Sequence, residues 1–338
     1  MIRLTKWIVG VAAAAVTLLP SPSAAQLLSS PYLKDESPAI RKIVVSGGVE
    51  LHYVERGTGM PVVFVHGSLS DGGYWNDQLG AFAARGYRAI AYSRRYNPPN
   101  VNNPQPGYSA VTDADDLAAF VEKLQLGKVH VVGHSYGALT ALFLAVRHPE
   151  LVRTLVLAEA PAVSLLAHLP DGRAAAGKVT YLDIQQRMLK PMKTAFQKGD
   201  RAAGLRAFIN FVLDDPQAWD NMPEAARKDM LDHAREWDII MTSGELFPDL
   251  DPEAVRKIAA PTLLLSGEKS YRFLKLIDEE LAHLLLNNRQ IILPEATHRM
   301  WYEQPETCRK AVLEFWQEQG TGVGAPAANR GLSGLRSE

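Results

Sequence analysis

Cysteine is nearly absent from this chain. Cys308 is the single cysteine among 338 residues, so no intrachain disulfide framework can form. Charge of one sign is also lacking, because 36 lysines and arginines stand against 37 aspartates and glutamates, for a formal net charge of −1. The sequence therefore lacks the basic excess of nucleic-acid-binding proteins. It contains no phosphate-binding loop, no zinc-type Cys/His cluster and no internal repeat, which leaves a globular protein of ordinary composition.

Long hydrophobic runs are lacking too. The apolar segment at residues 7–19 is shorter than the roughly 20 residues that a membrane-spanning helix needs. Arg3 and Lys6 precede it, and residues 20–25 combine helix-breaking prolines with small residues. This build predicts a secretory signal peptide over residues 1–25 and a periplasmic or secreted protein, with an uncleaved N-terminal anchor as the alternative. Residues 320–338 are rich in Gly, Ala and Ser and predict a disordered tail.

What the chain does have is an alternation of short apolar runs with amphipathic segments. Two strands joined by Gly47 and Gly48 are expected at residues 43–45 and 49–55. Buried strands are predicted at 61–65, 87–92, 128–132, 152–157, 261–265 and 290–293, with helices at 76–85, 113–126 and 305–317. This order predicts an α/β fold, with a mostly parallel eight-stranded sheet covered by helices on both faces.

Residues 162–256 interrupt that alternation. They contain no convincing buried strand, and helices are expected at 181–188, 202–211 and 224–237. We interpret the segment as a helical cap inserted into a core made of residues 26–161 and 257–319. Aromatic side chains of the cap, and one in the loop before the closing helix, either contact substrate or serve packing. The candidates for substrate binding are Phe208, Phe211, Trp219 and Trp301.

The most informative motif is Gly133-His134-Ser135-Tyr136-Gly137, which joins the strand at 128–132 to a helix. A serine between two glycines in a strand–turn–helix context is typical of a nucleophile elbow. A Cβ at either flanking glycine would clash with the neighbouring strand and helix. The turn exposes the serine at the edge of the sheet, where the helix directs its N–H groups toward any anion that forms. Ser135 is therefore the predicted nucleophile.

A serine hydroxyl needs a base within reach, and the base needs an orienting acid. His298 is the best candidate for the base, because it lies in a short loop after the strand at 290–293. His283 falls in a leucine-rich helical segment and is expected at the surface or in packing.

The acid is less obvious. After the strand at 261–265 the chain reads Ser266-Gly-Glu-Lys-Ser270, with serine where a carboxylate is expected. Glu268 or Asp278 is one alternative. The preferred candidate is Glu159, which ends the strand after the elbow helix, because a carboxylate there needs a partner such as histidine.

Two backbone N–H groups would form the oxyanion hole. Tyr136, next to the nucleophile, supplies one, and Ser68 in the loop after the strand at 61–65 supplies the other. His66 is expected to hold that loop in shape. Arg94 and Arg95 either bind a substrate carboxylate or pair with the acidic helix at 113–122.

In these motifs the chain resembles the α/β-hydrolase superfamily from about residue 43 to residue 319. The resemblance implies Ser135 as nucleophile, His298 as base, and Ser68 and Tyr136 as oxyanion donors. The position of Glu159 resembles that of the triad acid in one subgroup of the superfamily, where a glutamate follows the strand after the elbow. One branch of haloalkane dehalogenases and the zearalenone-type lactonases share this arrangement. Dehalogenases and epoxide hydrolases use an aspartate nucleophile, so Ser135 disfavours both.

The resemblance and the residues together predict a serine hydrolase that cleaves a carboxylic ester or lactone through an acyl-enzyme. No metal or organic cofactor is expected. Hydrolysis of a carbon–carbon bond, or acyl transfer, with the same triad is an alternative, since the cap sets the substrate. A hydrolase-like protein that only binds a ligand is a third hypothesis. The sequence defines neither the substrate nor the oligomeric state.

Overall fold

The computed structural model describes residues 39–170 and 172–323. The signal peptide predicted at 1–25 and most of the tail predicted at 320–338 lie outside the described residues. Within the described part, no helix combines the length and the apolar character needed to cross a membrane.

An eight-stranded sheet forms the centre of the fold, with the strand order β1-β2-β4-β3-β5-β6-β7-β8. β1 pairs antiparallel with β2, and β2 pairs antiparallel with β4; all other neighbours are parallel. The predicted mostly parallel sheet of eight strands is thus confirmed. The strands are β1 (Arg41–Val44), β2 (Glu50–Arg56), β3 (Met60–Val65), β4 (Tyr87–Tyr92), β5 (Val129–His134), β6 (Val152–Ala158), β7 (Thr262–Gly267) and β8 (Asn288–Leu293).

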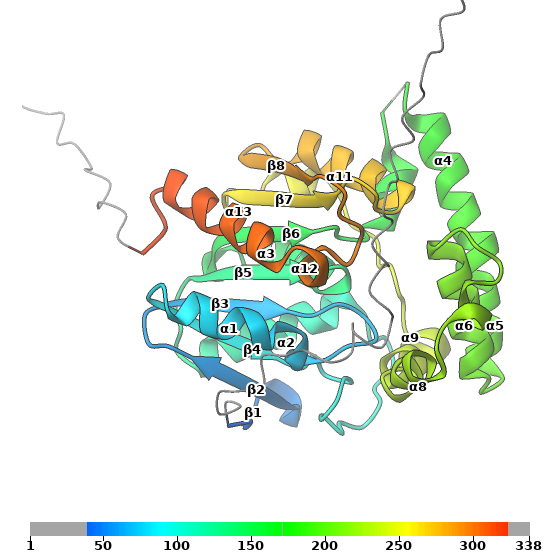
Figure 1. The fold of residues 1–338 in the computed structure, drawn as a ribbon, viewed down its shortest axis with the longest axis horizontal. Coiled ribbons are helices and arrows are strands. Elements are labelled where there is room, and N and C mark those ends of the chain that lie inside the picture. The colour runs from blue at the N-terminus through cyan, green and yellow to red at the C-terminus, as the bar shows by residue number, and fades with distance from the viewer. Residues whose placement is uncertain (1–38, 171, 324–338) are drawn as a thin grey trace, which may run out of the picture. The chain divides into compact units, whose positions relative to one another are not determined.

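Helices cover both faces of the sheet (Figure 1). Successive residues of the central strands alternate between two apolar clusters, as the two-residue period of a strand requires. One cluster packs against α1 (Asn76–Ala83), α12 (Met300–Glu303) and α13 (Pro305–Glu318). The other packs against α2 (Ala110–Lys123), α3 (Tyr136–Arg147) and α11 (Arg272–Leu284). Short 3₁₀ turns are η1 (Ser46–Gly48), η2 (Gly72–Trp75) and η3 (Pro149–Leu151).

The helical cap lies between β6 and β7 in sequence and beyond the carboxyl ends of the parallel strands in space (Figure 1). Sites in open α/β sheets gather at that edge. The cap elements are η4 (Val163–His168), α4 (Ala174–Asp183), the π-helix η5 (Ile184–Leu189), α5 (Lys190–Gln197), α6 (Arg201–Val212), α7 (Ala218–Asn221), α8 (Glu224–Asp232), α9 (Arg235–Ser243) and α10 (Pro252–Arg256).

One predicted cap helix is wrong in detail. Residues 224–237 form two helices, α8 and α9, which are separated by a turn at His233 and Ala234. No glycine or proline marks this break, and the turn coincides with contacts between the cap and loops of the core. The side chain of His233 lies 3.3 Å from Asp71, and Arg235 donates to the carbonyl oxygen of Asn100 at 3.1 Å.

Candidate active site

The turn between β5 and α3 has the geometry of a strained elbow. Ser135 occupies the turn with φ 54° and ψ −123°, a region that non-glycine residues rarely adopt. A Cβ at Gly137 would lie 2.2 Å from the carbonyl oxygen of Val65, and one at Gly133 would lie 2.6 Å from the Cα of Ala138. Both flanking positions therefore require glycine, and the strain is tolerated because packing on both sides leaves the turn no other shape.

Glu159 and His298 meet at the carboxyl end of β6. The glutamate is fully buried, also has a positive φ (54°), and bonds through Oε2 to Nδ1 of His298. The same oxygen accepts the hydroxyl of Ser270 at 2.6 Å, and Oε1 accepts the backbone N–H of Gly267 at 2.8 Å. Three donors thus compensate for the loss of water around one buried carboxylate.

The other two candidate acids lie elsewhere. Glu268 is exposed and accepts the backbone N–H of Glu295 at 2.9 Å. Asp278 is fully buried, and its carboxyl group lies 2.5 Å from the hydroxyl of Ser266. Burial, with the charge of Glu159 nearby, raises the pKa of Asp278 well above its ordinary range, which favours the uncharged form of this group. Of the three candidate acids, the structure brings only Glu159 to His298.

The tautomer of His298 follows from this contact. A carboxylate at Nδ1 holds the proton on that nitrogen, which leaves Nε2 with a free lone pair. The hydroxyl of Ser135 makes no hydrogen bond with any described residue, and the His298 side chain is 16% exposed. Catalytic hydrogen bonds in unliganded sites often tighten only when substrate binds. Nε2 of His298, the nitrogen that would accept the proton of Ser135, accordingly has no hydrogen-bond partner among the described residues.

His134 is a site residue that sequence reasoning missed. Its Nε2 lies 2.8 Å from the carbonyl oxygen of His298, and its ring stacks on Tyr74 with centroids 5.3 Å apart. Burial lowers the pKa of His134 to about 3, so the ring is neutral and donates to that carbonyl. The residue before the nucleophile therefore anchors the loop that carries the base. Its place beside Ser135 in the motif was the available signal.

Both predicted oxyanion donors are available. Among described residues, neither Ser68 nor Tyr136 uses its backbone N–H in a hydrogen bond. The loop of Ser68 packs directly on the elbow, since a Cβ at Gly67 would lie 3.2 Å from the Cβ of Ser135. His66 shapes this loop as expected: Nδ1 lies 2.8 Å from the carbonyl oxygen of Gly67.

The two arginines after β4 are engaged in ion pairs within the protein. Arg94 pairs with Asp113 of α2 at 2.6 Å and with Glu236 of the cap helix α9. Arg95 binds both carboxylate oxygens of Asp116 at 2.6 Å. Pairing with the acidic helix, rather than binding of a substrate carboxylate, is what the structure shows for both.

The aromatic candidates occupy packing positions. Trp301 is 4% exposed and packs against Trp75 in the cluster beneath α12 and α13. Trp219 is equally buried within the cap. Phe208 packs edge to face against Trp237, and Phe211 lies 6.1 Å from Phe273 between ring centroids. Substrate contacts by these four residues stay a prediction.

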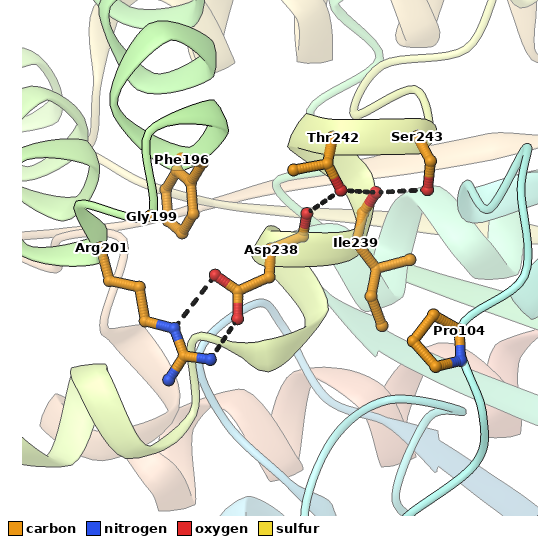
Figure 2. A pocket seen from close by; sticks show the side chains of 8 residues that line it. All are labelled: Pro104, Phe196, Gly199, Arg201, Asp238, Ile239, Thr242 and Ser243. Carbon is orange, nitrogen blue, oxygen red and sulfur yellow. Dashed lines mark hydrogen bonds and ion pairs between the residues drawn. The ribbon is translucent and has the colours of Figure 1, made fainter.

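A surface pocket of about 620 Å³ lies between α9, the turn from α5 to α6, and Pro104. Figure 2 shows that its polar groups bond to one another: Arg201 pairs with Asp238, and Thr242 and Ser243 donate to carbonyl oxygens of α9. None of the predicted site residues lines it. We therefore place the candidate chemistry at the end of β5 and β6 and not in this pocket.

Comparison with known proteins finds relatives over most of the chain. A model of the alpha/beta hydrolase family matches residues 62–311. A 2-hydroxy-6-oxo-6-(2'-aminophenyl)hexa-2,4-dienoic acid hydrolase from Metapseudomonas resinovorans is 30% identical over 296 residues, covering 83% of this chain and 92% of that protein. A bifunctional esterase/perhydrolase from Acinetobacter calcoaceticus is 28% identical, covering 81% and 98%. The structure of a thermophilic esterase from Thermogutta terrifontis superposes with a TM-score of 0.62 at 22% identity, covering 83% and 98%.

Proposed function

The chain belongs to the alpha/beta hydrolase family, and we propose that it is a serine hydrolase that cleaves a carboxylic ester or lactone. The observation that carries the proposal is the bond between buried Glu159 and Nδ1 of His298, formed beside an elbow that presents Ser135. A nucleophile, a base with its free nitrogen and an orienting acid are the three parts that acyl transfer to serine requires.

In the proposed reaction, Ser135 Oγ attacks the substrate carbonyl while Nε2 of His298 takes the hydroxyl proton. Glu159 keeps His298 in the required tautomer and stabilises the imidazolium that forms. The N–H groups of Ser68 and Tyr136 bind the oxyanion, assisted by the positive end of the α3 dipole. The imidazolium then protonates the leaving alkoxide, and the acyl group stays on Ser135. Water, deprotonated by His298, attacks the acyl-enzyme and releases the carboxylic acid and the free serine.

A carbon–carbon bond hydrolase is the second candidate, because the relative from Metapseudomonas resinovorans is named for an acidic dienoic substrate. Recognition of such an acid calls for a cation near the nucleophile. The two arginines that follow β4, Arg94 and Arg95, already bind Asp113, Glu236 and Asp116. This pairing favours an uncharged ester or lactone over a dioic or dienoic acid.

Labelling with a fluorophosphonate, combined with hydrolysis of p-nitrophenyl esters and aromatic lactones, tests the proposal. We expect wild type to be labelled at Ser135 and to turn over at least one substrate, and Ser135→Ala to lose both properties. Ser243→Ala is the matched control, because that exposed hydroxyl bonds only a carbonyl oxygen of α9. Turnover that survives in Ser135→Ala would refute the serine mechanism. Labelling without turnover of any ester or lactone would point to the carbon–carbon hydrolase.

A further inference from the structure

A buried ion cluster joins the cap to the core next to residues 66–71, the loop between β3 and η2 that contains Ser68 and is called the oxyanion loop below. Arg94 follows β4, Asp113 lies on α2 and Glu236 lies on the cap helix α9; their side chains are at most 1% exposed. Arg94 Nη1 lies 2.6 Å from Asp113, and Nη2 lies 2.9 Å from Oε2 of Glu236. Glu236 reaches the core across 142 residues of sequence, so this contact exists only when the cap is docked.

The same guanidinium also holds the oxyanion loop. Arg94 Nε donates to the carbonyl oxygen of His66 at 3.2 Å, and Nη2 donates to that of Gly67 at 3.1 Å. The backbone N–H of Arg94 donates to Nε2 of His66 at 3.0 Å, which leaves the proton on Nδ1, the nitrogen that donates to Gly67. Two donors therefore converge on one carbonyl oxygen.

That carbonyl belongs to the peptide whose N–H is the oxyanion donor of Ser68. In a planar trans peptide the C=O and N–H bonds point in opposite directions. Holding the Gly67 oxygen toward Arg94 consequently directs the Ser68 N–H to the opposite side of the loop, and the positive charge polarises the peptide in the sense that strengthens the donor. Arg94 also lies over the ring of Tyr136, 4.8 Å from its centroid, and Tyr136 supplies the other donor.

We propose that Arg94 is a positioning residue for the oxyanion hole and that Glu236 of the cap holds Arg94 in place. Docking of α9 thereby sets the orientation of the Ser68 donor, so the cap contributes to the rate of acyl transfer as well as covering the site. This inference rests on the proposed serine hydrolase function.

A second contact supports the coupling. His233, in the turn just before α9, lies 3.3 Å from Oδ2 of Asp71 in the oxyanion loop. The other oxygen of Asp71 accepts the backbone N–H of Gly73 at 2.7 Å and caps η2. Residues 233–236 of the cap thus engage the oxyanion loop directly through Asp71 and indirectly through Arg94.

The chain supplies a matched control for an ion pair of purely structural importance. Arg95 is adjacent to Arg94 and binds Asp116 of the same helix through two bonds of 2.6 Å. Its guanidinium also interacts with Gln105 and Tyr96, and within the described part of the chain it makes no hydrogen bond to the oxyanion loop. Asp116→Asn therefore disrupts a buried pair of the same kind without reaching the donors.

The test compares wild type, Glu236→Gln and Asp116→Asn by three measurements: the rate at which a fluorophosphonate labels Ser135, kcat and KM for p-nitrophenyl acetate, and the melting temperature. We expect Glu236→Gln to lower the labelling rate and kcat by about tenfold or more, with little change in KM. This loss is smaller than that caused by removing an oxyanion donor altogether, because the Ser68 N–H is misdirected and not removed. Asp116→Asn should melt earlier and keep its kcat. Glu236→Asp, which retains the charge but withdraws it by one methylene, provides an intermediate rate and a milder test if Glu236→Gln does not fold.

The inference is wrong if folded Glu236→Gln or Glu236→Asp labels and turns over at the wild-type rate. It is equally wrong if Asp116→Asn loses kcat to the same extent, since the effect is then one of general stability. Absence of labelling of wild-type Ser135 is a distinct result, which overturns the proposed function and this inference with it.

Discussion

Replacing Glu159 by glutamine gives the sharpest prediction about this site. The substitution keeps the shape of the side chain and removes its charge. Gly267 donates to one oxygen of Glu159, so the amide oxygen of glutamine will face that N–H and the amide nitrogen will face Ser270 and His298. Nδ1 of His298 must then accept a hydrogen bond from the amide instead of donating one. The ring is held in the tautomer whose Nε2 carries hydrogen, and it cannot take the proton of Ser135.

The size of the effect follows from this reversal. An asparagine in place of the triad aspartate of serine proteases leaves the geometry intact and lowers kcat by roughly 10⁴. Glu159 is fully buried, so no water can relieve the wrong tautomer, and we expect a loss of about 10³ to 10⁴ in kcat with little change in KM. Ser270→Ala removes one of three donors and leaves the tautomer unchanged, so its loss should stay below about tenfold.

The assay is hydrolysis of p-nitrophenyl esters, with folding checked by circular dichroism. Glu268→Gln is the matched control, because this exposed carboxylate lies in the neighbouring loop and bonds only the N–H of Glu295. A folded Glu159→Gln protein with near-normal kcat would refute the assignment of the acid. A large loss in Glu268→Gln would move the assignment to that residue.

Three further predictions concern the scaffold. Gly137→Ala should lower the free energy of unfolding by about 3 kcal/mol in urea titration, because the new Cβ would lie 2.2 Å from a backbone oxygen of β3; an unchanged midpoint would contradict the packing at the elbow. Asp278→Asn should keep kcat and gain stability relative to wild type as pH rises. Burial raises the pKa of Asp278, so at higher pH this carboxyl group ionises more readily in the unfolded chain than in the fold, and that difference destabilises wild type. The bond to Asp71 raises the pKa of His233 from 6.5 to about 9, so this pair stabilises the fold fully below pH 6.5 and loses its contribution by pH 9; thermal melts of His233→Gln should lack that slope, and an identical slope would refute the pairing.

The residues that sequence reasoning found are those with a local signature. Ser135 is marked by the glycines of its own turn, and Glu159 and His298 each follow a strand whose apolar run can be recognised in the sequence. The parallel sheet then brings the ends of β5, β6 and β8 to one edge, so the topology alone implies that these side chains gather there. The fold and the candidate triad were therefore predictable together.

Contacts between the cap and the core had no such signature. The break between α8 and α9 falls at His233 and Ala234, where local propensity favours a continuous helix. Arg94 and Glu236 are separated by 142 residues, and neither local sequence contains a pattern that predicts their pairing. Both the helix break and the ion pair depend on docking of the cap against the core, and the cap is the segment whose structure is least predictable from local sequence.

The loop after β7 shows how the site accommodates an acid that comes from β6. Where a carboxylate was expected, Ser270 and the N–H of Gly267 act as donors, and both bind Glu159. A second ionised carboxylate buried against Glu159 would repel it. Burial raises the pKa of the neighbouring Asp278, which favours its uncharged form, and Glu268 of the same loop is exposed. Ser270 thus donates a hydrogen bond to Glu159, which follows β6, because a buried acid at the end of one strand requires donors from the neighbouring loop.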